Sequence, residues 1–428
     1  MSQAETAILR SLDIGETQFW LFDQISTLNF SVFGLGYGLL DVAALLLSLK
    51  FVQLLYPLAH VGIQKASDSK SLVFVSSSKE IPLQIKHAGD NWQQQLATDT
   101  SQIFAPSDAP LIRAFLYLLE GNQWAFSLVF HHSIADGKSG IRFFKDVISN
   151  LASSHPANEP KKPSVPMHAM FPEEIAHQLE NTGSLPVSKA KNLPVFSEKI
   201  SEARPTITIL HLEKESLKKL REQARANSAS IHGILGAIQL KAIAELYEDF
   251  GSEAIPLNLS TPADARIYLT GKLDETDLGL YVTLLTSHIE ISAQMPLWEL
   301  ARALASDVKS QLQELDGLLF YKKLSDPTPF LKNEKSIRPF SLLMKMMPQA
   351  SVLSNVGVVA DFLPPNGICL DYLAFTVPPS ITQPVCITAL TFRDKMNIVM
   401  NYDINRWEKT AFEKFCSYYT NALLELTK

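Results

Sequence analysis

One short segment of this chain combines residue types that can do acid–base chemistry. Residues 131–137 read His-His-Ser-Ile-Ala-Asp-Gly, and the apolar run 125–130 comes directly before them. A neutral histidine has a pKa of about 6.5, so it can accept a proton near neutrality and return it later. Such a base suits acyl transfer, in which a hydroxyl or amine loses its proton as it attacks a carbonyl carbon.

The two residues that close the segment have separate uses. A carboxylate at Asp136 would be partly buried in the turn, and a buried charge needs a cation or several hydrogen-bond donors. Gly137 permits a tight turn and, with Lys138 and Ser139, opens a helix whose free N–H groups could stabilise an oxyanion. Zinc is a rival interpretation, but adjacent histidines rarely converge on one metal and no third ligand stands nearby at a recognised spacing. We expect no metal and no bound cofactor.

The neighbouring elements must hold this segment in place. Residues 125–130 read as a buried strand. After the segment, apolar residues recur at helical spacing at positions 141, 143, 144, 147, 148 and 151. The histidines therefore lie at the end of a strand, on a turn that leads into a helix, where a side chain can face a cleft.

The spacing His-His-xxx-Asp-Gly resembles the HHxxxDG motif of the superfamily of condensation domains, BAHD-like acyltransferases and chloramphenicol acetyltransferase. The resemblance covers nearly the whole chain. In length and sequence character the chain is most similar to standalone polyketide-associated acyltransferases of the phthiocerol-diester type. It implies that His132 is the general base and that Asp136 is structural and pairs with an arginine of the second lobe. Segment 258–266 resembles the segment that supplies this arginine, which makes Arg266 the expected partner.

Other positions fit the resemblance less closely. Residues 354–357 resemble its Ser-Asn-x-Gly turn, in which Asn355 could donate a hydrogen bond to the thioester carbonyl or the acceptor. Asparagine and glycine also tolerate left-handed backbone, so an ordinary turn is an equal alternative. We assign His131 to holding the turn. The Asp-Phe-Gly-Trp-Gly signature of the plant branch is absent, so the residues that contact coenzyme A cannot be assigned from the sequence. Tyr56 stands where members often carry a histidine, and we interpret this as a difference in packing.

Two further groups of residues have a structural and a functional interpretation. Met344, Met346 and Met347 could line an acyl tunnel because thioethers adapt to varied chains, but helix core is the favoured interpretation. His232 stands on an apolar helix, and we read it as structural.

The resemblance implies an α/β (α+β) fold of two chloramphenicol-acetyltransferase-like lobes, each a mixed sheet with helices, with the active site at their interface. We place the lobes at 1–155 and 206–428. Eight of the 24 prolines fall in or beside the intervening 156–205, which favours an extended connection with one short helix at 173–181 over regular structure. A plain disordered linker is the alternative. In the second half we expect strands at 206–212, 254–260, 281–291, 351–359, 370–375, 386–391 and 397–402, and helices at 214–226, 228–247, 298–315 and 407–426.

Composition narrows the class of protein. The 428 residues are 46% hydrophobic and 19% charged, enough for full cores. A net charge of −6 and the lack of a basic run with interleaved aromatics argue against nucleic-acid binding. Three widely spaced cysteines indicate reduced thiols in a cytoplasm.

Residues 1–13 show no signal peptide, and charged or polar residues interrupt the apolar stretch 33–61. We therefore expect a strand near 28–37, a buried helix at 42–55 and no membrane span.

These observations favour an O-acyltransferase of lipid or secondary-metabolite biosynthesis. Its donor would be a thioester, either acyl-coenzyme A or an acyl chain on a phosphopantetheinyl carrier protein, and its acceptor a small alcohol or, less favoured, an amine. One alternative is a freestanding condensation enzyme that forms an amide on a carrier-bound substrate. Another is a non-catalytic relative that binds carrier proteins. Since two lobes in one chain can complete a site without a second copy, we expect a monomer.

Overall fold

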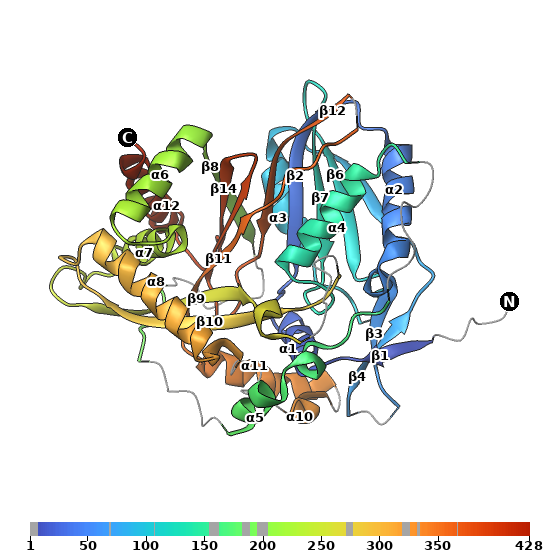
Figure 1. Ribbon diagram of the computed structural model, residues 1–428, viewed down its shortest axis with the longest axis horizontal. Helices are drawn as coiled ribbons and strands as arrows, with labels where there is room; N and C mark the ends of the chain where they lie inside the picture. Colours follow the sequence, from blue (N-terminus) through green and yellow to red (C-terminus); the bar gives the residue numbers. More distant parts are fainter. Residues whose placement is uncertain are drawn as a thin grey trace.

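The computed structural model describes residues 7–67, 70–106, 108–153, 162–181, 189–194, 204–270, 277–318, 326–331, 334–365 and 367–428. Its two lobes lie side by side, each built on a mixed sheet with helices (Figure 1). The first half of the chain forms β1 (Ile8–Ser11), α1 (Ile14–Asp23), β2 (Phe30–Gly38), α2 (Val42–Leu55), β3 (Val61–Lys65), β4 (Leu72–Ser76), β5 (Leu83–His87), α3 (Trp92–Thr100), β6 (Ile112–Leu118), β7 (Gln123–Phe130), α4 (Gly137–Ser149) and α5 (Glu173–Asn181).

The second half agrees closely with the predicted elements. It forms β8 (Pro205–Leu212), α6 (Lys214–Ala226), α7 (Ile231–Ala244), β9 (Ile255–Asp264), β10 (Val282–Ile291), α8 (Leu297–Gln313), α10 (Thr328–Leu331), α11 (Ile337–Met346), β11 (Ser351–Val358), β12 (Ile368–Thr376), β13 (Val385–Phe392), β14 (Lys395–Asp403) and α12 (Lys409–Leu426). Six of its strands make one sheet in the order β10-β9-β11-β13-β14-β8.

One strand of the second half departs from the predicted lobe boundaries. β12 is present where a strand was expected, but it joins the first-lobe sheet, whose order is β12-β2-β7-β6-β5. β12 pairs antiparallel with β2, and Phe375 lies opposite Val32. Its residues Leu373 and Phe375 are buried in the first-lobe core, and that burial holds the strand there. The two lobes therefore exchange backbone hydrogen bonds as well as side-chain contacts.

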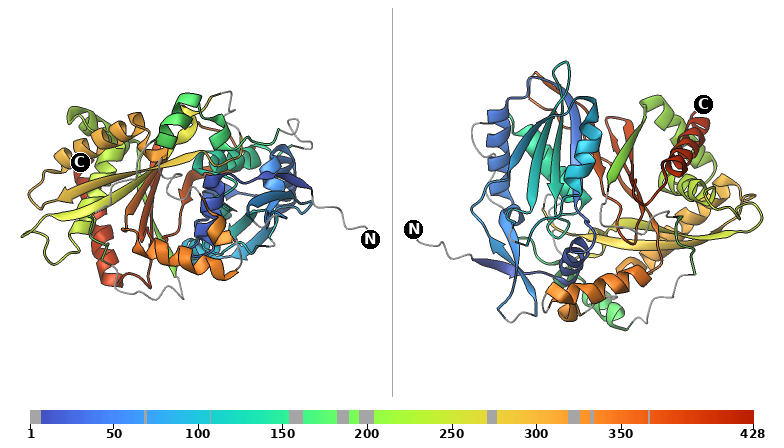
Figure 2. Two further views of the ribbon diagram at one scale, coloured as in Figure 1. Left: turned by 90° about the horizontal axis from the view of Figure 1, so that it is seen from below. Right: turned by 180° about the vertical axis from the view of Figure 1, so that it is seen from behind.

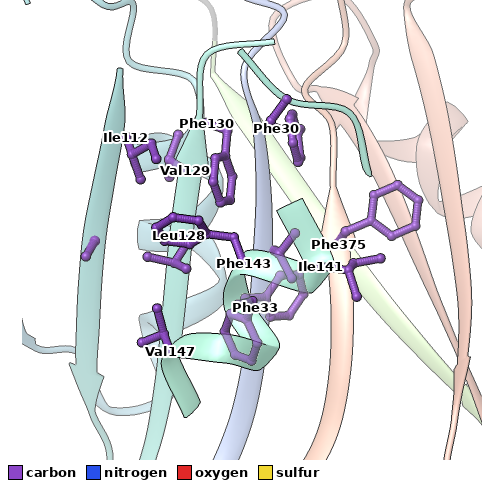
Figure 3. Packing of buried hydrophobic residues seen from close by; sticks show 14 of the residues in the cluster. Phe30, Phe33, Ile112, Leu128, Val129, Phe130, Ile141, Phe143, Val147 and Phe375 are labelled. Atoms are coloured by element: carbon purple, nitrogen blue, oxygen red, sulfur yellow. The ribbon is translucent and has the colours of Figure 1, made fainter. Parts of the chain in front are cut away.

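The first-lobe core fixes the position of α4, the helix that follows the candidate motif. Its side chains Phe143, Phe144 and Val147 are fully buried, and they pack with the apolar side chains of β2 and β7 (Figure 3). Gly140 lets the helix lie close to β2, because a Cβ there would come within 2.6 Å of the Phe30 ring. The Tyr56 ring also packs in this core, 5.3 Å from Phe143, which fits a packing role for that position.

α2 is buried on one face and exposed on the other, which corrects the expectation of a buried helix at 42–55. Leu45, Leu49 and Val52 face the core, while Leu46 and Leu54 are 47% and 45% exposed. The apolar character of the run therefore overstated its burial. No helix among the described residues is long and apolar enough to cross a membrane.

The described parts of the connection between the lobes make specific contacts. α5 has the bounds predicted from the sequence. Met167, 3% exposed, packs with Ala265 and Tyr281 of the second half. On the first-lobe side, Arg10 Nε donates a hydrogen bond to the Ser164 carbonyl oxygen at 3.1 Å. These contacts favour a docked connection over a plain linker, and the rest of the predicted segment lies outside the described residues. The view from below in Figure 2 shows α5 and α11 on opposite sides of α1.

Candidate active site

Two regular elements hold the candidate motif, as the sequence predicted. β7 ends at Phe130, and the His131 N–H continues its pairing by donating to the Leu111 carbonyl oxygen at 3.0 Å. α4 begins at Gly137 with Asp136 as its N-cap, and the Asp136 carboxylate accepts from the Ser139 N–H at 2.9 Å. A capped helix start of this kind fixes the turn because it satisfies backbone donors that the helix itself cannot.

The first histidine is buried and held on both ring nitrogens. His131 Nδ1 accepts from the Ser133 N–H at 3.1 Å, so its proton sits on Nε2. That nitrogen lies 3.5 Å from Oδ2 of Asp23, which is also buried. A ring fixed in this way can support the turn, the part we assigned to it, and has no nitrogen left for proton transfer.

The second histidine faces the space between the lobes. The His132 ring lies 4.4 Å from the Phe19 ring and 4.9 Å from the Phe30 ring, centroid to centroid. Its Nδ1 is buried and makes no hydrogen bond within the described part of the chain. Burial lowers the pKa of His132 to about 4, and the nearby Asp136 charge opposes that shift only in part. The imidazole is therefore neutral at pH 7 and able to accept a proton.

Asp136 and Arg266 form the ion pair that the resemblance implied. Arg266 Nη1 lies 2.9 Å from Asp136 Oδ2, and the Tyr281 N–H donates to the same oxygen at 3.0 Å. Arg266 also contacts Asp264 at 3.0 Å. Burial lowers the pKa of Arg266, but the two carboxylates outweigh this and raise it, so the guanidinium stays charged. The pair ties the start of α4 to the second half of the chain.

α1 clamps the motif, which the sequence reasoning did not predict. The Ser133 hydroxyl donates to the Glu16 carbonyl oxygen at 2.8 Å, Phe19 packs on His132, and Asp23 lies beside His131. These α1 residues are spaced so that they share one face of the helix. The sequence did carry a signal for the helix start, because Asp13-x-x-Glu16 is a capping box and both of its hydrogen bonds are present.

Gly137 and Asn355 come together from the two halves. Gly137 opens α4, and a Cβ at this glycine would lie 3.4 Å from a methyl group of Val356. Asn355 Oδ1 accepts from the Gly357 N–H at 2.9 Å, in a turn where Gly357 has a φ of 79°. This leaves the side-chain NH₂ of Asn355 without a partner among the described residues. The segment is thus an ordinary turn that also presents a free donor, so the two interpretations are compatible.

These residues share one cavity of about 1480 Å³ between the lobes. Ordinary small-molecule sites occupy roughly 300–1,000 Å³, so two substrates can fit at once. Part of its wall is apolar and comes from α1, β2, α11 and the segments beside them: Phe19, Phe22, Leu28, Phe30, Phe340 and Met344.

One interpretation of individual residues needs correction, and two histidines join the cavity wall. Met344, Met346 and Met347 all line the cavity, and Met346 is 75% exposed, so helix core was the wrong choice for Met346. Met344 lines the cavity and also packs against the first-lobe core. His232 also lines the cavity, with Nε2 3.0 Å from the Thr261 hydroxyl, and burial lowers its pKa to about 4. His288, one of the remaining histidines that we read as structural, is a further lining residue. Neither histidine stands in a motif, so only tertiary packing identifies them.

Other chemistries have little support in the described residues. No group of three or more His, Cys, Asp or Glu side chains there could hold a metal ion. All three cysteines are free thiols. Cys386 lines the cavity, but burial raises the pKa of its thiol to about 12, which makes it a poor nucleophile at neutral pH.

Comparison with known proteins agrees with the resemblance. Residues 201–401 match the family model of the phthiocerol/phthiodiolone dimycocerosyl transferase C-terminus. No curated protein matches the sequence. The family match and the shared fold together confirm the resemblance to the condensation-domain and chloramphenicol-acetyltransferase superfamily.

Three solved structures share the whole two-lobed fold. Polyketide synthase associated protein 5 from Mycobacterium tuberculosis is 15% identical, with a TM-score of 0.67 over 98% of this chain and 99% of that one. TRI3 trichothecene 15-O-acetyltransferase from Fusarium sporotrichioides is 11% identical, with a TM-score of 0.70 over 100% and 96%. The epimerization domain from the third module of tyrocidine synthetase B is 12% identical, with a TM-score of 0.63 over 99% of each chain. At these identities the likeness establishes the fold, while the family match supports a transferase.

Proposed function

We propose that this protein is an acyltransferase that moves an acyl group from a thioester, either acyl-coenzyme A or an acyl carrier protein, to an alcohol acceptor. The observation that carries the proposal is His132, a neutral imidazole lining a cavity with room for both substrates. Around it stand the two other features that acyl transfer needs, a set of hydrogen-bond donors and a rigid support.

The proposed reaction uses one base throughout. Because Nδ1 of His132 is the buried ring nitrogen, Nε2 takes the proton from the acceptor hydroxyl as its oxygen attacks the thioester carbon. The proton then passes from Nε2 to the departing thiolate, which restores the neutral ring. Because burial keeps the ring neutral at pH 7, Nε2 is free to accept the proton when the acceptor binds.

The proposed oxyanion site lies at the start of α4. Gly137 and Lys138 carry N–H groups that precede the first hydrogen bonds within the helix, and the Asn355 NH₂ group is a third candidate donor. Losing one such donor typically costs about 10²–10³ in kcat. Lys138, whose side chain is 52% exposed, lies at the same helix end and could meet a phosphate of the donor.

The proposal is tested by thiol release from acyl-coenzyme A thioesters of increasing length, with mixed alcohol and amine acceptors. We expect acceptor-dependent release from the wild type and its loss in His132→Ala. His87→Ala is the matched control, since His87 is an exposed histidine at the end of β5.

Each other outcome has a distinct meaning. Equal release from wild type and His132→Ala would remove His132 as the base. Release only with amine acceptors would favour the amide-forming alternative. Silence with coenzyme A donors and with a loaded carrier protein would favour a non-catalytic relative.

A further inference from the structure

One face of the second-lobe sheet forms a polar wall of the cavity. Side chains alternate along a strand, so residues next to Leu257, Leu259 and Leu353, which are buried in the second core, point to the opposite face. On four neighbouring strands, β10, β9, β11 and β13, that opposite face lines the cavity. We call its six polar residues the polar wall: Asn258, Ser260, Thr286, His288, Ser354 and Thr388.

The strand register brings these six residues together. Thr286 lies opposite Ser260, and His288 lies opposite Asn258, on paired strands. Ser354 lies opposite Thr388 on the next pair. Val352 pairs with Ser260 and so joins the two groups. The result is a continuous patch in the cavity that also holds the apolar wall formed by α1, β2 and α11.

Several hydroxyl groups of the polar wall have little to bond with in the protein itself. Ser260, only 3% exposed, has its hydroxyl 3.5 Å from that of Thr286, and a contact this long is at the limit of a hydrogen bond. Ser354 has no hydrogen bond within the described residues. By contrast, Thr388 donates to the Phe375 carbonyl oxygen at 2.5 Å. Hydroxyl groups that lack good hydrogen-bond partners on a buried surface favour a polar ligand. An apolar ligand would displace water from these hydroxyls and leave them without hydrogen bonds.

The charges around the polar wall decide which polar ligand fits. Gln311 accepts from the Thr286 N–H at 3.0 Å and donates to Asp307 at 2.7 Å, which places an acid beside the wall. Asp316 also lines this part of the cavity, and burial together with the charges of Glu314 and Asp307 raises its pKa. An acidic border repels phosphate groups.

The cations that could meet coenzyme A lie elsewhere. Lys138 and Arg266 contact Asp264 at the end of β9. Ser260 and Asn258 precede Asp264 by four and six residues on that strand. At about 3.3 Å per residue they lie roughly 13–20 Å away along β9. The polar wall is thus separated from Lys138, the cation that we assigned to a phosphate of the donor.

We propose that the polar wall holds the acceptor, and that this acceptor is an uncharged alcohol with several hydroxyl groups rather than an aliphatic alcohol. The inference rests on the proposed acyl transfer and adds the class of the acceptor. The acyl chain then lies against the apolar wall, beside Phe19 and Met344. The His132 ring packs on Phe19 and Phe30 of the apolar wall and lines the same cavity as the polar wall.

The test compares acceptors of one carbon count and different hydroxyl count: hexanol, hexanetriol and sorbitol. Each is assayed with one long-chain acyl-coenzyme A that the wild type accepts. The variant is Thr286→Val with Ser354→Ala, which removes two wall hydroxyls and nearly preserves shape. The control is Ser287→Ala, which removes a buried hydroxyl on the opposite face of β10.

We expect kcat/KM of the wild type to rise from hexanol to sorbitol. In the double variant the KM for sorbitol should rise about tenfold, a change of about 1.4 kcal/mol, because two hydroxyls that would bond the ligand are lost. Ser287→Ala should behave as the wild type does. A rise in the KM for acyl-coenzyme A instead would assign the wall to the donor's pantetheine arm and overturn the inference.

The remaining outcomes separate the two proposals. Wild-type turnover that is equal for hexanol and sorbitol, and lost in His132→Ala, would refute the polyol acceptor and leave acyl transfer intact. Absence of thiol release with all three acceptors, with coenzyme A and carrier-bound donors alike, would overturn the proposed function and the inference with it.

Discussion

Removal of the Asp136 carboxylate should destabilise the protein far more than its single side chain suggests. Its Oδ2 is bound by Arg266 and by the Tyr281 N–H, and its Oδ1 by the N–H and hydroxyl of Ser139. In Asp136→Ala these buried donors lose this acceptor, and Asp264 is then the one carboxylate left beside Arg266 among the described residues. Breaking one member of a buried ion pair costs about 3–5 kcal/mol. Because Asp264 still neutralises part of the charge, we expect the lower end, about 3 kcal/mol.

Thermal unfolding measures the effect, and a matched variant separates it from a general loss of charge. Asp264→Ala removes the other carboxylate next to Arg266, but its side chain is 22% exposed and its second partner is the exposed Lys138. We expect a loss of about 1 kcal/mol there. At roughly 2 °C per kcal/mol, Asp136→Ala should lower the melting midpoint by about 6 °C and Asp264→Ala by about 2 °C.

His132→Ala completes the comparison, since it should abolish turnover with little change in the melting midpoint. The reasoning about Asp136 is refuted if the midpoint of Asp136→Ala equals that of Asp264→Ala. In that case the carboxylate contributes no more than an exposed ion pair.

Three further predictions follow from the site. Because burial lowers the pKa of His132 to about 4, kcat/KM should stay level as the pH falls from 7 and should decline only near pH 4. A decline centred near pH 6.5 would show that the ring is solvated. The folded-state pKa values of His132 and His232 both lie below the unfolded value of about 6.5, so the unfolded chain binds more protons between pH 6.5 and 4, and the free energy of unfolding falls as the pH drops through that window. In urea titrations at several pH values, His232→Gln should make this fall less steep. An unchanged slope would contradict a buried neutral ring at His232. Asp23→Ala removes the carboxylate beside His131 and should lower kcat about tenfold to a hundredfold with little change in KM. Asp23→Asn should recover part of the rate. A lower melting midpoint with an unchanged kcat would show that Asp23 has only a structural role.

Local sequence patterns predicted most of the elements and the centre of the site. The apolar run before His131 and the helical spacing after Gly137 place the motif between β7 and α4, which is where the structure has it. α5 and α6 have the predicted bounds. Backbone hydrogen bonding, capping and periodicity act over a few residues, so a single sequence can report them. The family resemblance added Arg266, which periodicity alone would have left on the surface.

Tertiary structure decided what depends on segments far apart in the chain. β12 reads as an ordinary strand of the second half, and only the burial of Leu373 and Phe375 assigns it to the first-lobe sheet. The clamp of α1 on the motif, the methionines at the cavity and the polar wall have no local signature. Each arises because packing brings distant side chains to one surface, where the free energy depends on what all the neighbours bury together. The sequence thus supplied the candidate base, His132, while the folded molecule decided the lowering of its pKa by burial and the two unlike walls of the cavity that it lines.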